Sequence, residues 1–311
     1  MRITRGLRPL GRQTRWRVFV ARVRGVITQS GIEMDLKKQY ELLMRNDLKS
    51  LGCSKQFTDE QLKKRDRRDS SITSKIQDYE LSLLSNLFYS VVHRLFAKKP
   101  RQIVKYPGFD EKGNSVGISN LEKKIINGDS LIPHLSKLVF DADQAANNDP
   151  MLNEWSIYHF HIPPSDGNGS FVTRSKDLLF AIVTDDQFIF LDIQPHSNST
   201  GTYEPWIDVG IIEKIETHYP TLIEPYYIGD GRTPLTADQR KNLRDRNANT
   251  NIITTAGKEY RIPGCGSVSA GLPLNSIVRG DMAMSQIENL SASGSSVKLS
   301  FDNNYNLVAN T

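Results

Sequence analysis

The chain has 311 residues, of which 38% are hydrophobic and 24% charged, and its net charge is +5. A chain of this length and apolar content can bury a sizeable core, which excludes a fully disordered protein and predicts two domains, or one with a long extension. No apolar run reaches the roughly 18 residues that a membrane span needs. The two cysteines, Cys53 and Cys265, lie too far apart for a Cys-x-x-Cys metal pair, so we expect a soluble protein of the reducing cytoplasm without a membrane partner.

The charge is unevenly distributed along the chain. Residues 1–110 carry 24 Lys and Arg against 11 Asp and Glu, whereas the remaining residues carry 16 against 24. A basic half is attracted to phosphates or to an acidic partner, and an acidic half argues against a large nucleic-acid surface there. An equally good interpretation is that the two halves attract each other.

Residues 1–33 form a basic arm with eight arginines, no lysine and a single acid, Glu33. Arginines interrupt its apolar residues throughout, which excludes a secretory signal and leaves a composition like that of an organelle transit peptide. A clean helical pattern begins directly afterwards at Met34. We therefore expect a disordered arm or a misassigned start at Met1, and we expect the fold not to need the arm.

Apolar residues at helix spacing predict a helical region over residues 34–146. Its strongest helix is expected over Ile76–Phe96, with His93 packed or at the surface beside the apolar stripe. After a break rich in proline and glycine, a further helical section is expected from Leu121 to Ala146. The basic run Lys63–Arg68 could contact RNA, but the acids within it favour a solvated helix face or loop.

Three strand-like runs follow, over Trp155–Ile162, Leu178–Val183 and Phe188–Ile193. The second and third are joined by a polar connection of hairpin length, and such connections are too short for parallel crossovers. The runs therefore predict an antiparallel three-stranded meander. The apolar period changes from 3.6 to 2 near Asn147, so we expect a separate α+β domain over residues 147–311.

The fold class predicted for the whole chain is α+β, with flanking helices and hairpins around a small antiparallel sheet. After the meander, a helix is expected over Val209–His218, and a capping box at Thr236–Gln239 opens a short basic helix. Residues 252–262 and the last residues of the chain are both typical of hairpins. The glycine-rich stretch 263–271 has neither phosphate-loop nor dinucleotide-fingerprint spacing, so we interpret it as a loop.

Histidines gather around the expected meander. His159 and His161 alternate on one face of the first strand, and His196 follows the end of the third. If the registers agree, these three side chains approach one another. The connection between the first two strands adds three charged residues: Arg174, Lys176 and Asp177.

This combination suits phosphodiester chemistry. Histidine is a general acid or base near neutral pH, and arginine or lysine can hold phosphate. RNA cleavage without a metal needs a base for the ribose 2′-OH, an acid for the leaving 5′ oxygen and a cation for the phosphorane charge. We therefore take four residues as catalytic candidates and two as substrate-binding candidates. They are His159, His161, His196 and Asp177, and then Arg174 and Lys176.

Three runs of residues also resemble a known family. They are Trp155-x-x-Tyr158-His159-x-His161, then Lys176–Ile182, then Asp185-Asp186-x-Phe188-Ile189-Phe190-Leu191, ending at His196. This pattern is similar to the C-terminal core of RelE-type mRNA interferases, especially the YafQ branch. The resemblance implies a RelE-like meander in a metal-independent, RNA-cleaving toxin or defence effector without a cofactor. It also implies three partners: RNA, the ribosome and a cognate antitoxin-like protein. The block from Asp149 to His161 also looks like an uncharacterised family of bacterial proteins.

Two other classes of function fit the same residues. The three histidines could bind one divalent metal such as zinc, with Asp177 or Asp192 as a carboxylate ligand, in a metal-dependent enzyme. Alternatively, the strand histidines pack in the core of a noncatalytic protein that works by binding a partner, because a fold does not fix a function.

Overall fold

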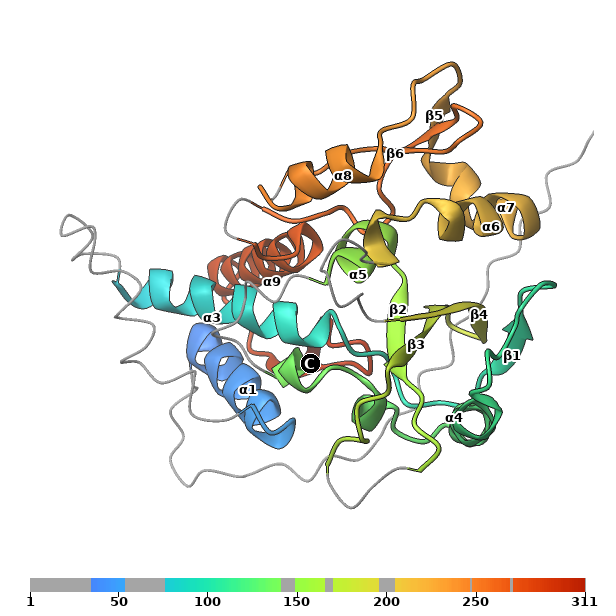
Figure 1. Cartoon of the computed structure of the whole chain (residues 1–311). Coiled ribbons are helices and arrows are strands. Elements are labelled where there is room, and N and C mark those ends of the chain that lie inside the picture. The colour runs from blue at the N-terminus through green and yellow to red at the C-terminus, as the bar shows by residue number, and fades with distance from the viewer. Residues whose placement is uncertain are drawn as a thin grey trace, which may run out of the picture. The chain divides into compact units, whose positions relative to one another are not determined.

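The computed structural model describes residues 35–53, 76–140, 149–165, 170–195, 205–246, 248–268 and 271–310. Both helices and strands build it, which confirms the α+β class (Figure 1). Three features expected from the sequence lie outside the described residues: the basic arm of residues 1–33, the basic run Lys63–Arg68, and His196. None of the described helices is long and apolar enough to cross a membrane.

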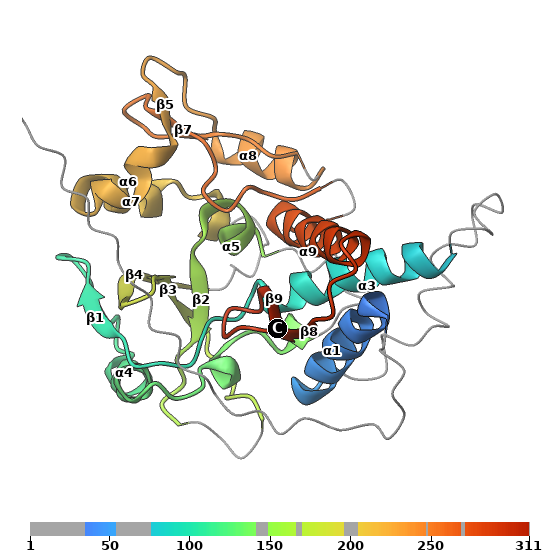
Figure 2. The same ribbon diagram turned by 180° about the vertical axis from the view of Figure 1, so that it is seen from behind.

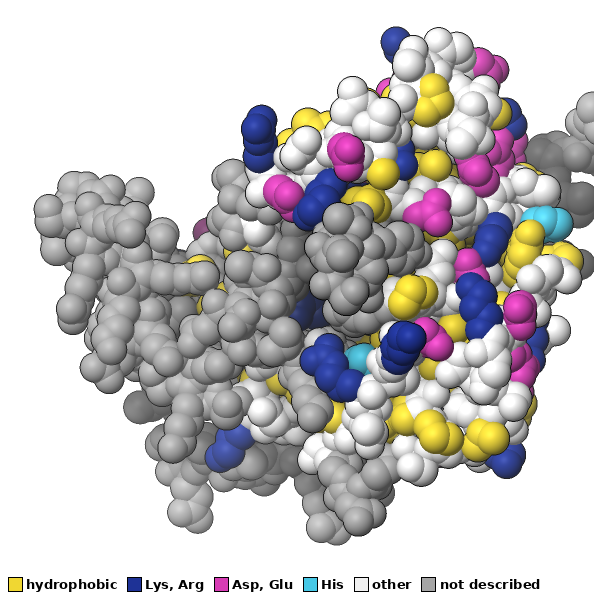
Figure 3. All heavy atoms as spheres, in the orientation of Figure 1, with side chains coloured by type: hydrophobic (Ala, Val, Ile, Leu, Met, Phe, Trp, Pro, Cys, Tyr) yellow, Lys and Arg dark blue, Asp and Glu magenta, His cyan; other side chains and the backbone are white. Residues whose placement is uncertain are grey.

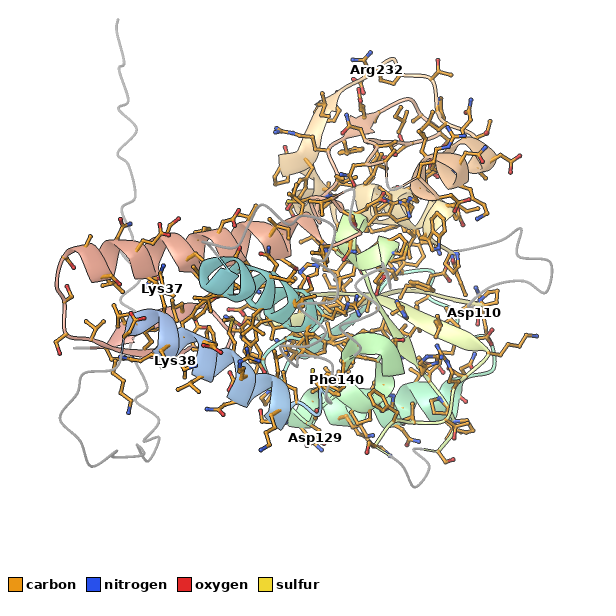
Figure 4. All side chains as sticks on the ribbon, turned by 90° about the vertical axis from the view of Figure 1, so that its left-hand side faces the viewer. Lys37, Lys38, Asp110, Asp129, Phe140 and Arg232 are labelled. Carbon is orange, nitrogen blue, oxygen red and sulfur yellow. The ribbon has the colours of Figure 1, made fainter. Side chains whose placement is uncertain are left out.

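Three helices pack with a C-terminal hairpin around one core. They are α1 (Leu36–Ser50), α3 (Ile76–Val92) and α9 (Leu274–Ala292), with strands β8 (Lys298–Phe301) and β9 (Leu307–Asn310). Buried side chains recur at every fourth residue of α1, at Leu36, Tyr40, Met44 and Leu48. This stripe packs against α3, α9 and the hairpin (Figure 4). This core therefore contains residues of the expected helical region together with residues near the C-terminus. Residues from both sides of Asn147, where the apolar period changes, share it.

The main sheet has the strand order β1-β4-β3-β2. Its strands are β1 (Gln102–Lys105), β2 (Tyr158–His161), β3 (Asp177–Val183) and β4 (Gln187–Pro195). Strands β2, β3 and β4 form the expected antiparallel meander. Strand β1 adds a parallel partner to β4 and comes from the region expected to be helical, so that expectation was wrong at this point. Four residues are too few for a period to be recognised.

The first expected strand begins too early. Trp155 lies in helix α5 (Pro150–Trp155), and β2 starts only at Tyr158, so the placement of Trp155 on the strand face was wrong. Asp149 caps this helix by accepting a hydrogen bond from the backbone N–H of Leu152, and proline occupies the first helical position. Ser156 then ends the helix in the left-handed region, with φ 57°. These local signals outweigh the alternation of apolar residues.

The expected helical section from Leu121 to Ala146, with a new helix starting near Ile132, was also wrong in its extent. Helix α4 (Ser115–Asn127) begins earlier and ends at Gly128, which adopts a φ of 72°. A side chain there would be strained, and its Cβ would lie 2.6 Å from the backbone nitrogen of Pro100. Two short 3-10 turns follow, η1 (Ile132–His134) and η2 (Lys137–Phe140). The remaining residues, 141–146, lie outside the described ranges.

Both faces of the main sheet are covered. One face packs against α4 and the 3-10 turns through Leu179, Phe188 and Ile193. The other packs against α5 and α6 (Gly210–His218) through Phe180 and Leu191. A bulge between Phe180 and Ala181 leaves Leu191 of β4 without a partner in β3. The order in which successive β4 residues face the two sides of the sheet is therefore reversed after Leu191.

The segment after β4 forms a smaller layer around α6 (Figure 2). It holds η3 (Pro205–Ile207), α7 (Pro220–Ile223), η4 (Glu224–Tyr226), β5 (Tyr227–Gly229), α8 (Ala237–Arg244), β6 (Ile252–Ile253) and β7 (Glu259–Tyr260). The capping box at Thr236 and the hairpin of β6 with β7 are as the sequence predicts.

Candidate functional site

His159 and His161 lie on one side of β2, as their spacing predicts. Each belongs to a row across the meander. His159 lies opposite Phe180, which lies opposite Asp192. His161 lies opposite Leu178, which lies opposite Gln194. The two imidazoles nevertheless have different surroundings, and these surroundings decide what each can do.

His159 forms an ion pair with Asp149. The Nδ1 atom lies 3.2 Å from Oδ2 of Asp149, and each side chain is 19% exposed. No described residue hydrogen-bonds Nε2, the other ring nitrogen. Because the capping role of Asp149 fixes its carboxylate at the start of α5, the helix holds the imidazole in one orientation.

The electrostatics of this pair favour a protonated His159. Burial by itself lowers the pKa of His159, but the charge of Asp149 and the hydrogen bond to it outweigh burial and the nearby Arg94 and Arg174, so this pKa is raised. Burial raises the pKa of Asp149, but His159 outweighs it and that pKa is lowered. A cationic imidazole on which two further positive charges act indicates a site that can serve an anionic ligand.

The ion pair predicts a pH-dependent stability. The raised pKa of His159 contributes stability that is complete below the ordinary value of 6.5 and is lost as pH rises through the folded-state pKa. The lowered pKa of Asp149 contributes stability above 3.8 that is lost as pH falls through its folded-state pKa. We expect the free energy of unfolding of His159→Asn to fall less steeply at alkaline pH than that of the unmodified protein. Urea denaturation over a pH series measures this. An unchanged decline would show that His159 is not its source.

His161 is buried, with 3% of its surface exposed. Its Nδ1 lies 3.4 Å from the hydroxyl oxygen of Ser175. That hydroxyl donates to the backbone carbonyl of Asp177 at 2.6 Å and accepts from the backbone N–H of Ile162 at 3.0 Å. The ring of His161 therefore contacts the segment that leads into β3 and is not exposed to solvent.

A pocket of about 300 Å³ opens over this segment. Its lining comes from Asn114, from residues 162–165 after β2 and from residues 173–177 before β3, and so includes Arg174, Lys176 and Asp177. Arg174 and Lys176 are exposed, and neither makes an ion pair or a hydrogen bond with another described residue. On the face seen in Figure 3, Lys and Arg side chains gather beside a histidine near the middle of the view.

His196 lies outside the described residues, so its approach to the other two histidines stays a prediction. The register does bring the end of β4 to the pocket, because Pro195 pairs with Asp177. Among the described residues, no group of three His, Cys, Asp or Glu side chains could hold a metal ion. The structure thus brings together Arg174, Lys176 and Asp177, and places His159 and His161 on one side of the neighbouring strand.

Several residues of this site were not recognised in the sequence. Asp149 partners His159, Arg94 acts on it electrostatically, and Asn114 donates a hydrogen bond to the Asp177 carboxylate at 3.3 Å. The Asp149-Pro150 pair was a recognisable helix start, but nothing local connects it to a histidine ten residues later. His93 proves to lie in the same polar region, where burial lowers its pKa to about 4.

Comparison of the chain with protein-family models, with curated proteins and with solved structures gave no match.

Proposed function

We propose that the chain is a metal-independent endoribonuclease of the RelE-like toxin class, with His159 as its general acid. One observation carries the proposal. A carboxylate holds His159 on β2, and the charge of Arg174 acts on this imidazole; Arg174 and Lys176 line a pocket next to the end of β2 and have no described counter-charge. Unpaired cations attract phosphates, and a histidine with a raised pKa carries a proton to give.

The reaction needs one proton removed and one donated. A base takes the proton of the ribose 2′-OH, the 2′ oxygen bonds to phosphorus, and the bond from phosphorus to the 5′ oxygen breaks. His159 donates its proton to that leaving oxygen, and Arg174 with Lys176 stabilises the extra charge on phosphorus. The products are a 2′,3′-cyclic phosphate and a 5′-hydroxyl end.

The other histidines take different parts in this proposal. His196 is the proposed base; it follows Pro195 in the sequence, and Pro195 pairs with Asp177 of the pocket lining. His161 is a positioning residue, since it is buried and contacts Ser175 rather than the pocket space.

The proposal is tested with purified full-length protein, a labelled RNA and a chelator, with and without a cell-free translation mixture. We expect the protein to cleave RNA in the presence of the chelator. The cleavage rate of His159→Asn should be about 10²- to 10⁴-fold lower, because the general acid is lost. Asparagine can still donate a hydrogen bond to Asp149, so the fold is kept. His218→Asn is the matched control, because His218 is exposed and stacks edge-on against Tyr106.

Three results would overturn the proposal. Wild-type protein that leaves RNA intact in both settings would favour a noncatalytic binding protein. Activity that disappears with the chelator and returns with zinc would favour the metal-dependent alternative. Cleavage by His159→Asn at the wild-type rate would remove His159 from the chemistry.

A further inference from the structure

The pocket beside β3 contains hydrogen-bond acceptors as well as cations. Asn114 donates through Nδ2 to the Asp177 carboxylate at 3.3 Å and to the backbone carbonyls of Glu111 and Lys112, each at 3.2 Å. Its amide hydrogens are thereby used within the protein, which leaves its side-chain oxygen as an acceptor. On Asp177, Oδ2 receives the Asn114 bond, and no described residue donates to Oδ1.

Exposure separates the two kinds of polar group. Arg174 and Lys176 are exposed, whereas Asn114 and Asp177 are half-buried. Pro163 and Pro164 add apolar surface to the same lining. A volume of about 300 Å³ lies at the lower end of the range for small-molecule sites. A fitting ligand would have an anionic group near the exposed Arg174 and Lys176. It would also have a flat ring whose N–H donors meet the half-buried Asn114 and Asp177.

We propose that this pocket binds a guanine nucleotide, with the phosphate on Arg174 and Lys176 and the base on Asp177. Among the RNA bases, guanine presents two adjacent N–H donors on one edge, N1–H and N2–H, and a carboxylate can accept both. Adenine and cytosine place an acceptor nitrogen beside their amino group, and uracil flanks its single N–H with two carbonyls. A carboxylate repels those neighbouring acceptors.

This inference rests on the proposed ribonuclease activity for its biological meaning, and it gives Asp177 a part in base recognition rather than in proton transfer. The enzyme would cleave RNA next to a guanosine. The phosphate held by Arg174 and Lys176 would be the one attacked.

Binding of single nucleotides tests the inference without any cleavage. Full-length protein is titrated with 3′-GMP, 3′-IMP, 3′-AMP and 3′-UMP, with binding measured by isothermal titration calorimetry. Inosine lacks only the 2-amino group of guanosine. We therefore expect 3′-IMP to bind about 10- to 100-fold more weakly than 3′-GMP, because it loses one hydrogen bond to a charged group. This comparison uses the unmodified protein and so does not depend on how a variant folds.

A variant pair then assigns the effect to one side chain. Asp177→Asn keeps an oxygen that can accept from Asn114 but loses the charge, and we expect it to bring 3′-GMP and 3′-IMP to nearly equal affinity. Asp129→Asn is the control, an exposed carboxylate just after α4, and it should keep the preference (Figure 4).

Two outcomes would overturn the inference. One is equal affinity for all four nucleotides and for inorganic phosphate, which would make the pocket a general anion site. The other is a guanine preference that survives in Asp177→Asn. Guanine-selective binding without RNA cleavage would instead contradict only the ribonuclease proposal, so the two failures are distinguishable.

Discussion

Replacing Arg244 with alanine is expected to lower the free energy of unfolding by about 3–5 kcal/mol. The Nη2 atom of Arg244 lies 2.6 Å from Oε2 of Glu154, and the two side chains are 5% and 8% exposed. Burial raises the pKa of Glu154 to about 6 although Arg244 acts to lower it. Removal of the guanidinium would leave a carboxylate in a site where its charge is already costly.

The guanidinium of Arg244 also lies between two indole rings. Its central carbon is 4.9 Å from the ring centre of Trp155 and 4.8 Å from that of Trp206. These contacts tie α8 to α5 and η3, and a planar guanidinium makes them better than an ammonium does. We therefore expect Arg244→Lys to be destabilising as well, although it keeps the charge.

Urea denaturation of the full chain at neutral pH measures these effects. Arg232→Ala is the control, because Arg232 pairs with Glu259 at 2.8 Å but its side chain is 63% exposed, and such pairs contribute about 1 kcal/mol or less. If Arg244→Ala were as stable as Arg232→Ala, the buried pair would contribute nothing beyond a surface pair. Glu154→Gln combined with Arg244→Met should recover part of the loss, because it removes both buried charges.

The meander could be predicted because its signals are local. Two apolar runs and the four-residue polar connection between them define β3 and β4, and the spacing of His159 and His161 places them on one face of β2. The helical region and the later capping box follow from equally short patterns. Each of these features depends on residues within a few positions of one another.

The site could be predicted only in part, because its pairings are not local. Asp149 reaches His159 because α5 turns back at Ser156, and the pattern around Trp155 reads equally well as a strand. Asn114 reaches Asp177 across 63 positions, because α4 starts beside the first residue of β3. The apolar run of β4 could not show the bulge at Leu191, which moves Asp192 onto the side that His159 occupies.

The start of α4 also predicts the second large effect on stability. Gly117 lies where the helix touches the chain leaving β2, and a Cβ there would lie 2.2 Å from the carbonyl oxygen of Ile162 and 3.0 Å from that of Pro163. Both neighbours are backbone atoms, so no side-chain rotation can relieve the clash. We expect Gly117→Ala to lower the free energy of unfolding by about 3 kcal/mol, the upper end of the usual cost of overpacking.

The same substitution should weaken ligand binding, because Ile162 and Pro163 line the pocket beside Asp177. Urea denaturation gives the loss of stability, and titration with 3′-GMP under conditions where the variant is folded gives the loss of affinity. Gly229→Ala is the matched control, since nothing lies within 4 Å of its Cβ position, and we expect a change of less than about 1 kcal/mol. Wild-type stability in Gly117→Ala would mean that α4 can move away from β2 at little cost, and that the pocket wall is not fixed by this contact.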